Sequence, residues 1–245
     1  MCGRFVLEAS REAVEALFEV EVTGLFEPRY NIAPSQPVLF VHAFQGVRAT
    51  DYGRWGLVPH WHKEPDKAQM MINARIETVA EKPWFRTAVR HRRVLVPATH
   101  FYEWRREGKA RQPFAVNRKN DAKTEGLFAF AGIVDETHGG DGSAVPTLAL
   151  LTEQAEGEVA DIHHRMPVVV PAEHFASWLD CRTVEPTMAL EALRPPPDDA
   201  WTMWPVDPVV NRAGVDGAKL LLPVDIEADA AKSATAEPKA QLDLF

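Results

Sequence analysis

The chain has 245 residues, 46% of them hydrophobic and 25% charged, and this length suits one large domain or two small ones around a buried core. No apolar stretch approaches the ~20 residues of a membrane span, and the N-terminus lacks the basic and apolar pattern of a signal peptide. The net charge of −8 and the two cysteines argue against a generally basic protein, a disulfide framework and a cysteine zinc site, so we expect a cytoplasmic protein without membrane association.

The first predicted elements are a short helix and an ordered loop. Val14, Leu17 and Phe18 have the i, i+3, i+4 spacing of one apolar face, which predicts a helix over residues 10–20 with its first residue, a serine, as the cap. Residues 28–37 contain three prolines and are typical of an ordered loop.

Short runs of branched and apolar residues predict the strands that follow. These runs are Val38–His42, Arg93–Val96, Pro113–Val116, Leu127–Val134, Thr147–Leu151 and Pro167–Val170. A hairpin loop is expected at residues 139–142, and helices at residues 173–179 and 186–193. Because strands dominate and helices do not alternate with them, the pattern favours an α+β fold with an antiparallel core.

The composition changes near residue 225. Residues 225–240 lack apolar periodicity and are rich in Ala, Glu, Asp, Lys and Ser, which predicts a flexible linker. The chain then ends in Gln-Leu-Asp-Leu-Phe at residues 241–245, a compact apolar cluster. We therefore expect one domain over residues 2–224, followed by a linker and a C-terminal docking peptide.

Cys2 is the first candidate for chemistry. Removal of Met1 would leave Cys2 with a free α-amine and a thiol on adjacent carbons, which titrate at about 7.7–8.0 and about 8.5. Such an aminothiol can condense with an aldehyde to a Schiff base and then close to a thiazolidine. The alternative is that Cys2 merely follows the start codon. Cys2 and Cys181 could also form a single disulfide, although thiols in a cytoplasmic protein more often stay reduced.

One segment is basic although the whole chain is acidic. Between Lys82 and Arg111 the acidic residues are Glu103 and Glu107, whereas the basic residues are Lys82, Arg86, Arg90, Arg92, Arg93, Arg105, Arg106, Lys109 and Arg111. This segment could line a phosphate-binding groove or form a solvated charged surface, and charge alone favours neither.

Three further residues combine a reactive side chain with a turn or strand end. Asn73 could act as a catalytic amide or cap a loop. Glu103 lies among aromatic residues that would raise its pKa, or it could pair with a surface arginine. His163 could transfer protons near neutral pH, or it could be a packed or capping histidine. Each signal is weak when taken alone.

Taken together, the motifs resemble the SRAP (SOS-response-associated peptidase) family over residues 2–224. In chain order they are Cys2-Gly3-Arg4-Phe5, Asn31-Ile32-Ala33-Pro34, Trp55-Gly56-Leu57-Val58-Pro59, Asn73-Ala74-Arg75-Ile76-Glu77-Thr78, Phe101-Tyr102-Glu103-Trp104 and Ile162-His163-His164-Arg165-Met166-Pro167. The resemblance implies an α+β single domain with a barrel-like antiparallel core, peripheral helices and a groove for single-stranded DNA. It also implies that mature Cys2 captures the aldehyde of an abasic site as a thiazolidine crosslink.

The resemblance also implies which residues form the site. The catalytic residues would be Cys2, Asn73, Glu103 and His163, and the DNA contacts would be Arg4, Trp61, Arg75, Arg86 and Arg165. Glu103 could help to open the sugar to its aldehyde, His163 could transfer protons, and Asn73 could hold the amine or a sugar hydroxyl. His62 stands where some members have a second aromatic residue, so a stacking contact there is in doubt.

The C-terminal pentapeptide resembles the motif by which bacterial replication and repair proteins bind the β sliding clamp. Leu242, Leu244 and Phe245 would fill an apolar pocket, and Gln241 would set the register through hydrogen bonds. This peptide predicts the clamp as a partner and association with the nucleoid at replication forks.

We therefore expect a DNA-protection protein that crosslinks to abasic sites, with β-lyase activity as a side path. The main alternative is an N-terminal-nucleophile peptidase in which Cys2 attacks an amide and cleaves off Met1, and a third is DNA binding alone. We expect a monomer without a cofactor. His60 and His62 form an HxH pattern, but no carboxylate or cysteine pattern accompanies them, so no metal is expected.

Overall fold

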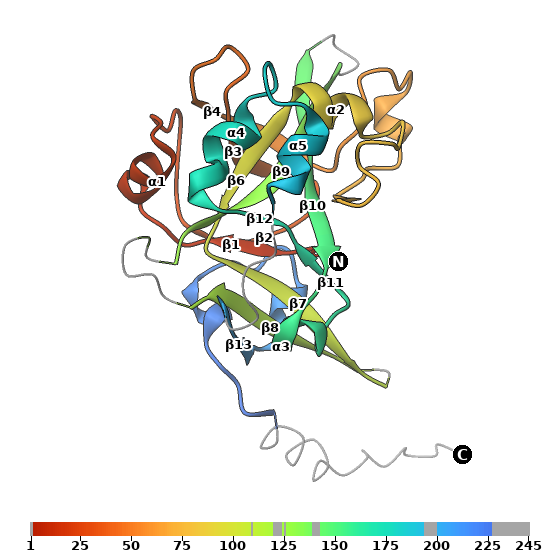
Figure 1. Ribbon diagram of the computed structural model, residues 1–245. Coiled ribbons are helices and arrows are strands. Elements are labelled where there is room, and N and C mark those ends of the chain that lie inside the picture. Colours follow the sequence, from red (N-terminus) through yellow and green to blue (C-terminus); the bar gives the residue numbers. More distant parts are fainter. Residues whose placement is uncertain are drawn as a thin grey trace, which may run out of the picture.

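The computed structural model describes residues 2–108, 110–119, 124, 126–138, 143–193 and 200–226. Its strands form two sheets that lie one above the other in Figure 1. The upper sheet contains β3 (Pro37–His42), β4 (Ala49–Trp55), β5 (Asn73–Arg75), β6 (Arg93–Ala98), β9 (Phe128–His138), β10 (Ala144–Gln154), β11 (Arg165–Pro167) and β12 (Val169–Val170). The lower sheet contains β1 (Phe5–Leu7), β2 (Arg29–Ile32), β7 (His100–Glu107), β8 (Ala110–Arg118) and β13 (Trp201–Pro205).

The upper sheet closes on itself as a barrel. Its strands follow the order β10-β4-β3-β6-β9, and β9 pairs again with β10, so the ring has no free edge between these strands. All of these pairings are antiparallel except β4 with β10, which is parallel. The interior is packed with large side chains such as Trp55, Phe40, Phe130 and Leu95, all of them buried. The predicted α+β fold with a barrel-like core is confirmed, with one parallel pairing added.

Short helices lie at the periphery of both sheets, as expected (Figure 1). They are α1 (Arg11–Phe18), α2 (Arg86–His91), α3 (Gly157–Ala160), α4 (Phe175–Leu179) and α5 (Pro186–Glu191), with single 3₁₀ turns at Pro65–Lys67, Ala172–His174, Pro208–Asn211 and Ala218–Leu221. The Ser10 hydroxyl accepts the Ala13 N–H and begins α1, which buries Val14 and Phe18. Helices α2 and α4 pack on β6, and α2 also packs on β9 (Figure 1). No helix among the described residues is long and apolar enough to cross a membrane.

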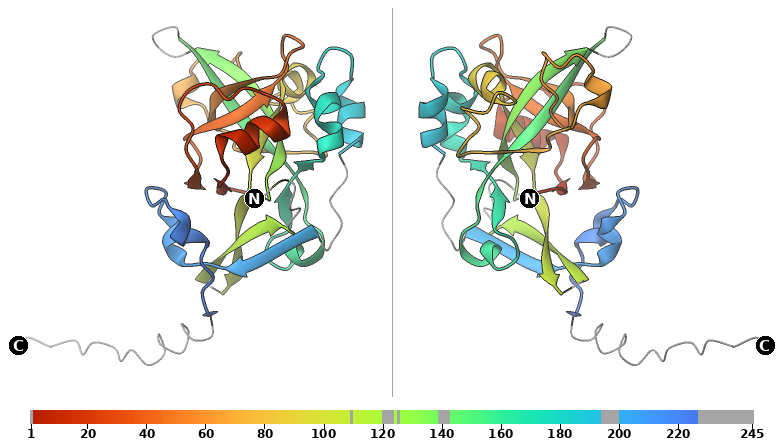
Figure 2. Two further views of the ribbon diagram at one scale, coloured as in Figure 1. Left: turned by 90° about the vertical axis from the view of Figure 1, so that its left-hand side faces the viewer. Right: turned by 90° about the vertical axis from the view of Figure 1, so that its right-hand side faces the viewer.

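The lower sheet runs in the order β13-β8-β7-β1-β2 and carries the N-terminal segment. Its longest pair is the hairpin of β7 and β8, which extends away from the barrel (Figure 1). Both views in Figure 2 show the N-terminal end of the chain where the two sheets meet. The fold therefore brings the first residues to the junction between two independent sheets.

Some expected boundaries differ from those observed. Residues 28–37 were expected to form a loop, but Arg29–Ile32 form strand β2 because their backbone pairs with β1. The strand expected at residues 167–170 is divided between β11 and β12. The hairpin loop at 139–142 lies outside the described residues. So do the peptide at 241–245 and all but the first two residues of the linker at 225–240.

The basic segment does not form a single charged surface. Arg93 is fully buried, and its guanidinium donates hydrogen bonds of 2.5–3.1 Å to the carbonyl oxygens of Val89, Trp178, Asp180 and Val184. These bonds satisfy carbonyl groups at the ends of α2 and α4 that would otherwise be buried without a donor. Arg93 is therefore a structural residue that joins the helices to β6, whereas Arg86 and Arg90 are exposed.

Candidate active site

Strand β1 brings the N-terminal residues to the middle of β7. Phe5 lies opposite Phe101, and the backbone N–H of Tyr102 donates to the carbonyl of Arg4 at 3.0 Å. Continuation of this antiparallel register places Gly3 opposite Glu103. The pairing thus sets Cys2 next to the one acidic residue in this part of β7.

Cys2 lies in a buried position with defined contacts. Its exposed fraction is 0%, and its carbonyl oxygen accepts a hydrogen bond of 2.8 Å from Asn73 Nδ2. The thiol is free and lies 3.7 Å from the carbonyl oxygen of Arg4, while Cys181 is also a free thiol. Burial, and then the charge of Glu103, raise the pKa of the Cys2 thiol. The thiol is therefore protonated at neutral pH and lies within electrostatic range of Glu103.

Asn73 holds Cys2 with one end of its amide and leaves the other end open. It begins β5, which pairs in parallel with β10 through Asn73 and Leu150. Its Nδ2 binds the Cys2 carbonyl, whereas Oδ1 is buried and accepts no hydrogen bond from the described residues. A buried acceptor without a donor is costly, so this oxygen is suited to a donor supplied by another group.

Glu103 is a buried carboxyl group. It is 1% exposed, and burial raises its pKa to about 7. Strand neighbours Phe101 and Phe114 contribute apolar surface near it, since Phe114 lies directly opposite Glu103 on β8. A carboxyl group with a pKa near neutrality can both donate and accept a proton under physiological conditions. The sequence prediction of a raised pKa for Glu103 is confirmed.

His163 lies just before β11, on the other side of β10 from Asn73. Thr152 of β10 pairs with Arg75 of β5 and with Pro167 of β11, so the two short strands flank the same part of β10. The Nδ1 atom of His163 lies 3.0 Å from both the backbone nitrogen and the carbonyl oxygen of Arg165, which fixes the ring. Burial lowers the pKa of His163, and the charge of Arg106 on β7 adds to this effect.

The structure brings three of the four expected catalytic residues together, since Cys2 is bonded to Asn73 and affected by the charge of Glu103. Figure 1 shows the N-terminal end of the chain beside β11 and above β7. His163 precedes β11, which pairs with β10 on the side opposite β5. The described residues contain no group of three His, Cys, Asp or Glu side chains placed to hold a metal ion.

The five expected DNA contacts fall into two groups. Trp61, Arg75 and Arg86 are exposed and available to a ligand. Arg4 is instead bonded within the protein, donating to Asn31 Oδ1 at 2.9 Å and to the carbonyl groups of residues 210 and 211 at 2.6 and 3.1 Å. Burial lowers its pKa, and its bonds join the N-terminal segment to the turn at Pro208–Asn211.

Arg165 is also engaged internally. It is 8% exposed and forms a bidentate pair with Glu77 at 2.5 and 2.9 Å. A third bond, to the Thr152 carbonyl, ties it to β10. These contacts hold the backbone on which His163 lies, and the Arg165 hydrogen bond lowers the pKa of Glu77.

Trp61, His62 and Trp84 form an aromatic cluster that is partly exposed. Trp61 is 48% exposed, and its ring meets Trp84 edge to face at 5.6 Å. His62 lies 5.9 Å from Trp84 and 6.1 Å from Trp61, so it belongs to the same cluster. Sequence reasoning missed Trp84, although its position two residues before Arg86 in the basic segment is a usable signal.

Comparison with known proteins identifies a family that matches most of this chain. A model of the SOS response associated peptidase (SRAP) family matches residues 1–213. The chain is 34% identical over 225 residues to the abasic site processing protein YoaM of Bacillus subtilis (strain 168), covering 90% of this chain and 97% of that protein. It is 32% identical over 248 residues to the abasic site processing protein HMCES of Gallus gallus, covering 89% and 73%.

The fold also matches a solved structure. A crystal structure of a protein from Bacteroides thetaiotaomicron superimposes with a TM-score of 0.79, at 21% identity, over 91% of this chain and all of that one. This likeness concerns the fold, which is thus shared at low sequence identity.

Substitution of Glu103 by Gln should stabilise the protein at high pH. The native pKa of about 7 lies above the unfolded value of about 4.3, so the native state binds a proton that the unfolded state has released. The stability contributed by this group is present below about pH 4.3 and is lost as the pH rises through 7. We expect Glu103→Gln to gain on the order of 3 kcal/mol over wild type at pH 8.5, and little at pH 4.5.

Chemical denaturation at the two pH values measures this difference. The same substitution at Glu158, which is exposed on α3, is the matched control and should leave the difference between the two pH values unchanged. An equal effect of Glu103→Gln at both pH values would contradict the raised pKa.

Proposed function

The chain belongs to the SOS response associated peptidase (SRAP) family of abasic-site processing proteins, and from this membership we propose that it binds single-stranded DNA and links Cys2 covalently to abasic sites. The observation that carries the proposal is the position of Cys2, buried, bonded to Asn73 and next to a carboxyl group with a pKa of about 7. Such an arrangement suits an aldehyde that must be trapped by an amine and a thiol in turn.

The proposed chemistry begins with the amine. After removal of Met1, the α-amine of Cys2 adds to the aldehyde carbon of the ring-opened sugar, and loss of water gives a Schiff base. The thiol then adds to the same carbon, its proton passes to the imine nitrogen, and a five-membered thiazolidine closes. Overall one aldehyde and one aminothiol give one thiazolidine and one water. Each step moves protons, so the surrounding acids and bases control the rate.

Glu103 and His163 are the proton carriers in this proposal. Glu103 donates a proton to the ring oxygen as the closed sugar opens, a step that a carboxyl group with a pKa of about 7 can perform near neutrality. His163, whose ring is fixed by Arg165 and whose pKa is lowered, is neutral at pH 7 and accepts protons during amine attack. The amine chemistry also permits β-elimination of the DNA, so lyase activity is a side path.

Asn73 positions the nucleophile. Its Nδ2 holds the Cys2 carbonyl, and its unpaired Oδ1 is the acceptor that we assign to the Cys2 amine or to a sugar hydroxyl. A hydrogen bond from the amine to this oxygen directs the nitrogen lone pair away from the amide and toward the substrate.

The DNA would be bound without reading its sequence. Arg75 and Arg86 are exposed and can neutralise backbone phosphates, and Trp61 can stack on a base beside the abasic site. Arg4 and Arg165, by contrast, contribute in this proposal mainly by holding Cys2 and His163 in position. Exposed arginines of this kind would let an acidic protein make local contacts with an acidic polymer.

A peptidase that uses the Cys2 thiol as its nucleophile is the second candidate, and the structure favours it less. The thiolate is the attacking species in cysteine peptidases, whereas burial and Glu103 raise the pKa of this thiol. The aldehyde trap needs the thiol only after the Schiff base has formed, when intramolecular closure makes a neutral thiol sufficient.

We also propose that the C-terminal peptide delivers the protein to the replication machinery. Gln241, Leu242, Leu244 and Phe245 match the pattern of a β-clamp-binding peptide, in which apolar side chains enter a pocket and the glutamine sets the register. A linker of polar composition separates the peptide from the domain, so both could be engaged at once. Single-stranded abasic sites are exposed at replication forks, where the clamp is present.

Incubation with single-stranded DNA that contains one abasic site tests the main proposal. We expect a covalent complex on a denaturing gel, and its intact mass should equal the protein without Met1 plus the DNA minus one water. Cys2→Ala should abolish the stable complex, whereas Cys181→Ala should retain it. Cys2→Ser keeps an amine but forms no thiazolidine, so its complex should survive only after borohydride reduction. Retention of Met1, or a stable complex with Cys2→Ala, would refute the proposal.

Glu103→Gln should slow crosslinking and change its pH dependence. If Glu103 must be protonated, the wild-type rate at saturating DNA falls as the pH rises above about 7. The variant should lose this falling limb and react about 10²-fold more slowly. Single-turnover rates between pH 5.5 and 8.5 measure both effects, and an unchanged rate and profile would exclude the acid role.

Deletion of residues 241–245 should abolish binding to the β clamp and leave crosslinking intact. The physical reason is that the apolar anchors and the glutamine are lost while the domain that contains the site is complete. Surface plasmon resonance on immobilised clamp measures the binding, and Gln241→Ala with Phe245→Ala in the full chain provides a second test. Undiminished clamp binding by the deletion variant would disprove this role.

A further inference from the structure

Trp61 lies in the loop between Leu57 and Met71, which is bonded to the barrel at its base and at one turn. Leu57 and Met71 exchange backbone hydrogen bonds of 2.9 and 3.1 Å, which close the loop at its base. Near its start the loop makes a tight turn at residues 59–62, closed by the N–H of His62 and the carbonyl of Pro59 at 3.0 Å. His60 and Trp61 occupy the two corners of this turn. Whatever fixes His60 therefore also fixes Trp61.

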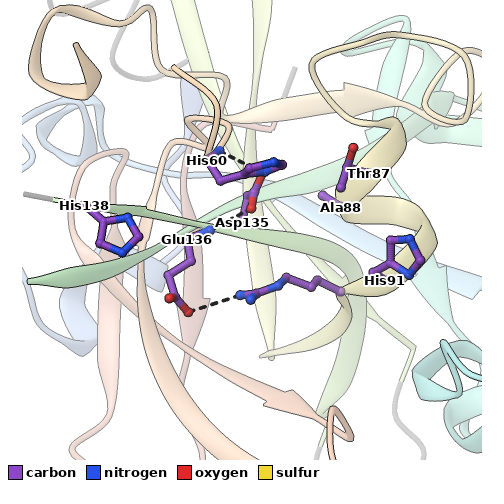
Figure 3. A pocket seen from close by; sticks show the side chains of 8 residues that line it. His60, Thr87, Ala88, His91, Asp135, Glu136 and His138 are labelled. Carbon is purple, nitrogen blue, oxygen red and sulfur yellow. Dashed lines mark hydrogen bonds and ion pairs between the residues drawn. The ribbon is translucent and has the colours of Figure 1, made fainter. Parts of the chain in front are cut away.

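His60 is held by a single buried carboxylate. Asp135 on β9 is 5% exposed, and its Oδ2 lies 3.1 Å from the backbone nitrogen of His60 and 3.0 Å from its Nδ1. Because a carboxylate only accepts, both groups of His60 must donate to it. The second oxygen, Oδ1, accepts the N–H of Glu136 at 2.9 Å. Figure 3 shows the His60 ring and Asp135 pointing toward one another.

Packing does not hold the turn on this side. An open cavity of about 370 Å³ separates it from helix α2, with His60 and Asp135 on one side and Thr87, Ala88 and His91 on the other (Figure 3). Without side chains behind it, the turn depends on its hydrogen bonds. The bonds to Asp135 involve a charged acceptor in a buried position, where they are stronger than those between neutral groups.

Trp84 also contacts the turn. The rings of Trp61 and Trp84 meet edge to face with their centroids 5.6 Å apart, and Trp84 Nε1 lies 3.4 Å from the Leu57 carbonyl at the base of the loop. Thr147 on β10 adds one more bond, since its hydroxyl lies 3.0 Å from the Val58 nitrogen. Together these contacts hold Trp61 in place while its side chain stays 48% exposed.

We propose that Asp135 is a positioning residue that acts through His60 to hold Trp61 as a rigid platform for a base of single-stranded DNA. The inference rests on the proposed DNA binding and deepens it, because it assigns part of the affinity to a carboxylate that never touches DNA. An acidic residue that strengthens binding to a polyanion is unexpected from charge alone. The gain comes from preorganisation: a platform that is already ordered loses less conformational entropy on binding.

Asp135→Asn tests this role because it keeps the size of the side chain. The carboxylate accepts hydrogen bonds with both oxygens, whereas an amide has one oxygen and one NH₂ group. If the NH₂ group faces His60, two donors oppose each other and the hydrogen bonds are lost. The turn should loosen while the barrel stays folded, which thermal denaturation verifies. The matched control is Glu136→Gln, the next residue, which pairs with Arg92 at 3.2 Å across the same cavity and makes no contact with the turn.

The readout is a double-mutant cycle on binding. Single-stranded DNA with a tetrahydrofuran abasic analogue, which cannot open to an aldehyde, isolates binding from chemistry. We expect Asp135→Asn to raise the dissociation constant about tenfold. Trp61→Ala should have a similar effect, because the loss of stacking between a base and an aromatic ring accounts for a change of this size. In the Trp61→Ala background Asp135→Asn should have no further effect. Glu136→Gln should bind like wild type.

Crosslinking at saturating DNA completes the test. Because Asp135 does not touch the reacting atoms, the single-turnover rate of Asp135→Asn should equal that of wild type once DNA is saturating. Additive effects of Asp135→Asn and Trp61→Ala, or wild-type affinity in Asp135→Asn, would overturn the inference. A wild-type protein that neither binds nor crosslinks abasic DNA would instead refute the proposed function, so the two failures are distinguishable.

Discussion

Strand β10 is the constraint on which the rest of the structure depends. It pairs with its chain neighbours β9 and β11 and with the distant strands β4 and β5, so four segments take their positions from one backbone. A shift of its register by one residue would turn Asn73 and the residues beside His163 to the opposite face. The closed barrel prevents such a shift, because every strand of the ring is paired on both sides. The relative positions of the site residues are therefore fixed by the closed ring of strands.

The sequence predicts the parts of this fold that have local signals. Apolar spacing and branched residues act over a few positions, so they predict the helix at residues 10–20 and the strands β3, β6, β8, β9 and β10. They do not predict β4 and β7, whose sequences contain charged residues. Nor do they predict the three-residue strands β1 and β5, which are too short to show alternation and are stabilised by partners far along the chain. Sequence motifs predict the four catalytic candidates. The role of Asp135 has no local signal, because its hydrogen bonds to His60 join residues 75 positions apart.

The electrostatics of the site have the same origin as the packing of the fold. Burial between the sheets raises the pKa values of both the Cys2 thiol and Glu103, and it lowers that of His163. Each shift favours the neutral form of its group, and Glu103 is left with a pKa close to neutral pH. A group whose pKa lies near the ambient pH exchanges protons readily. Burial of such ionisable groups, however, lowers the stability of the fold. Arg93 shows the contrast, since its buried charge is compensated by carbonyl groups and serves structure alone.

The hydrogen bonds between Arg4 and the turn at Pro208–Asn211 have a consequence for the order of events during synthesis. Arg4 and Val210 are 206 positions apart, and a ribosome needs roughly 10–40 s to add that many residues. Until then Arg4 has no partner at the C-terminal turn, although β1 can already pair with β2 and β7. In the finished molecule Cys2 is wholly enclosed. The Arg4 contacts that complete the enclosure of Cys2 therefore form only after nearly the whole domain has been synthesised, so the site is among the last parts of the fold to reach its final geometry.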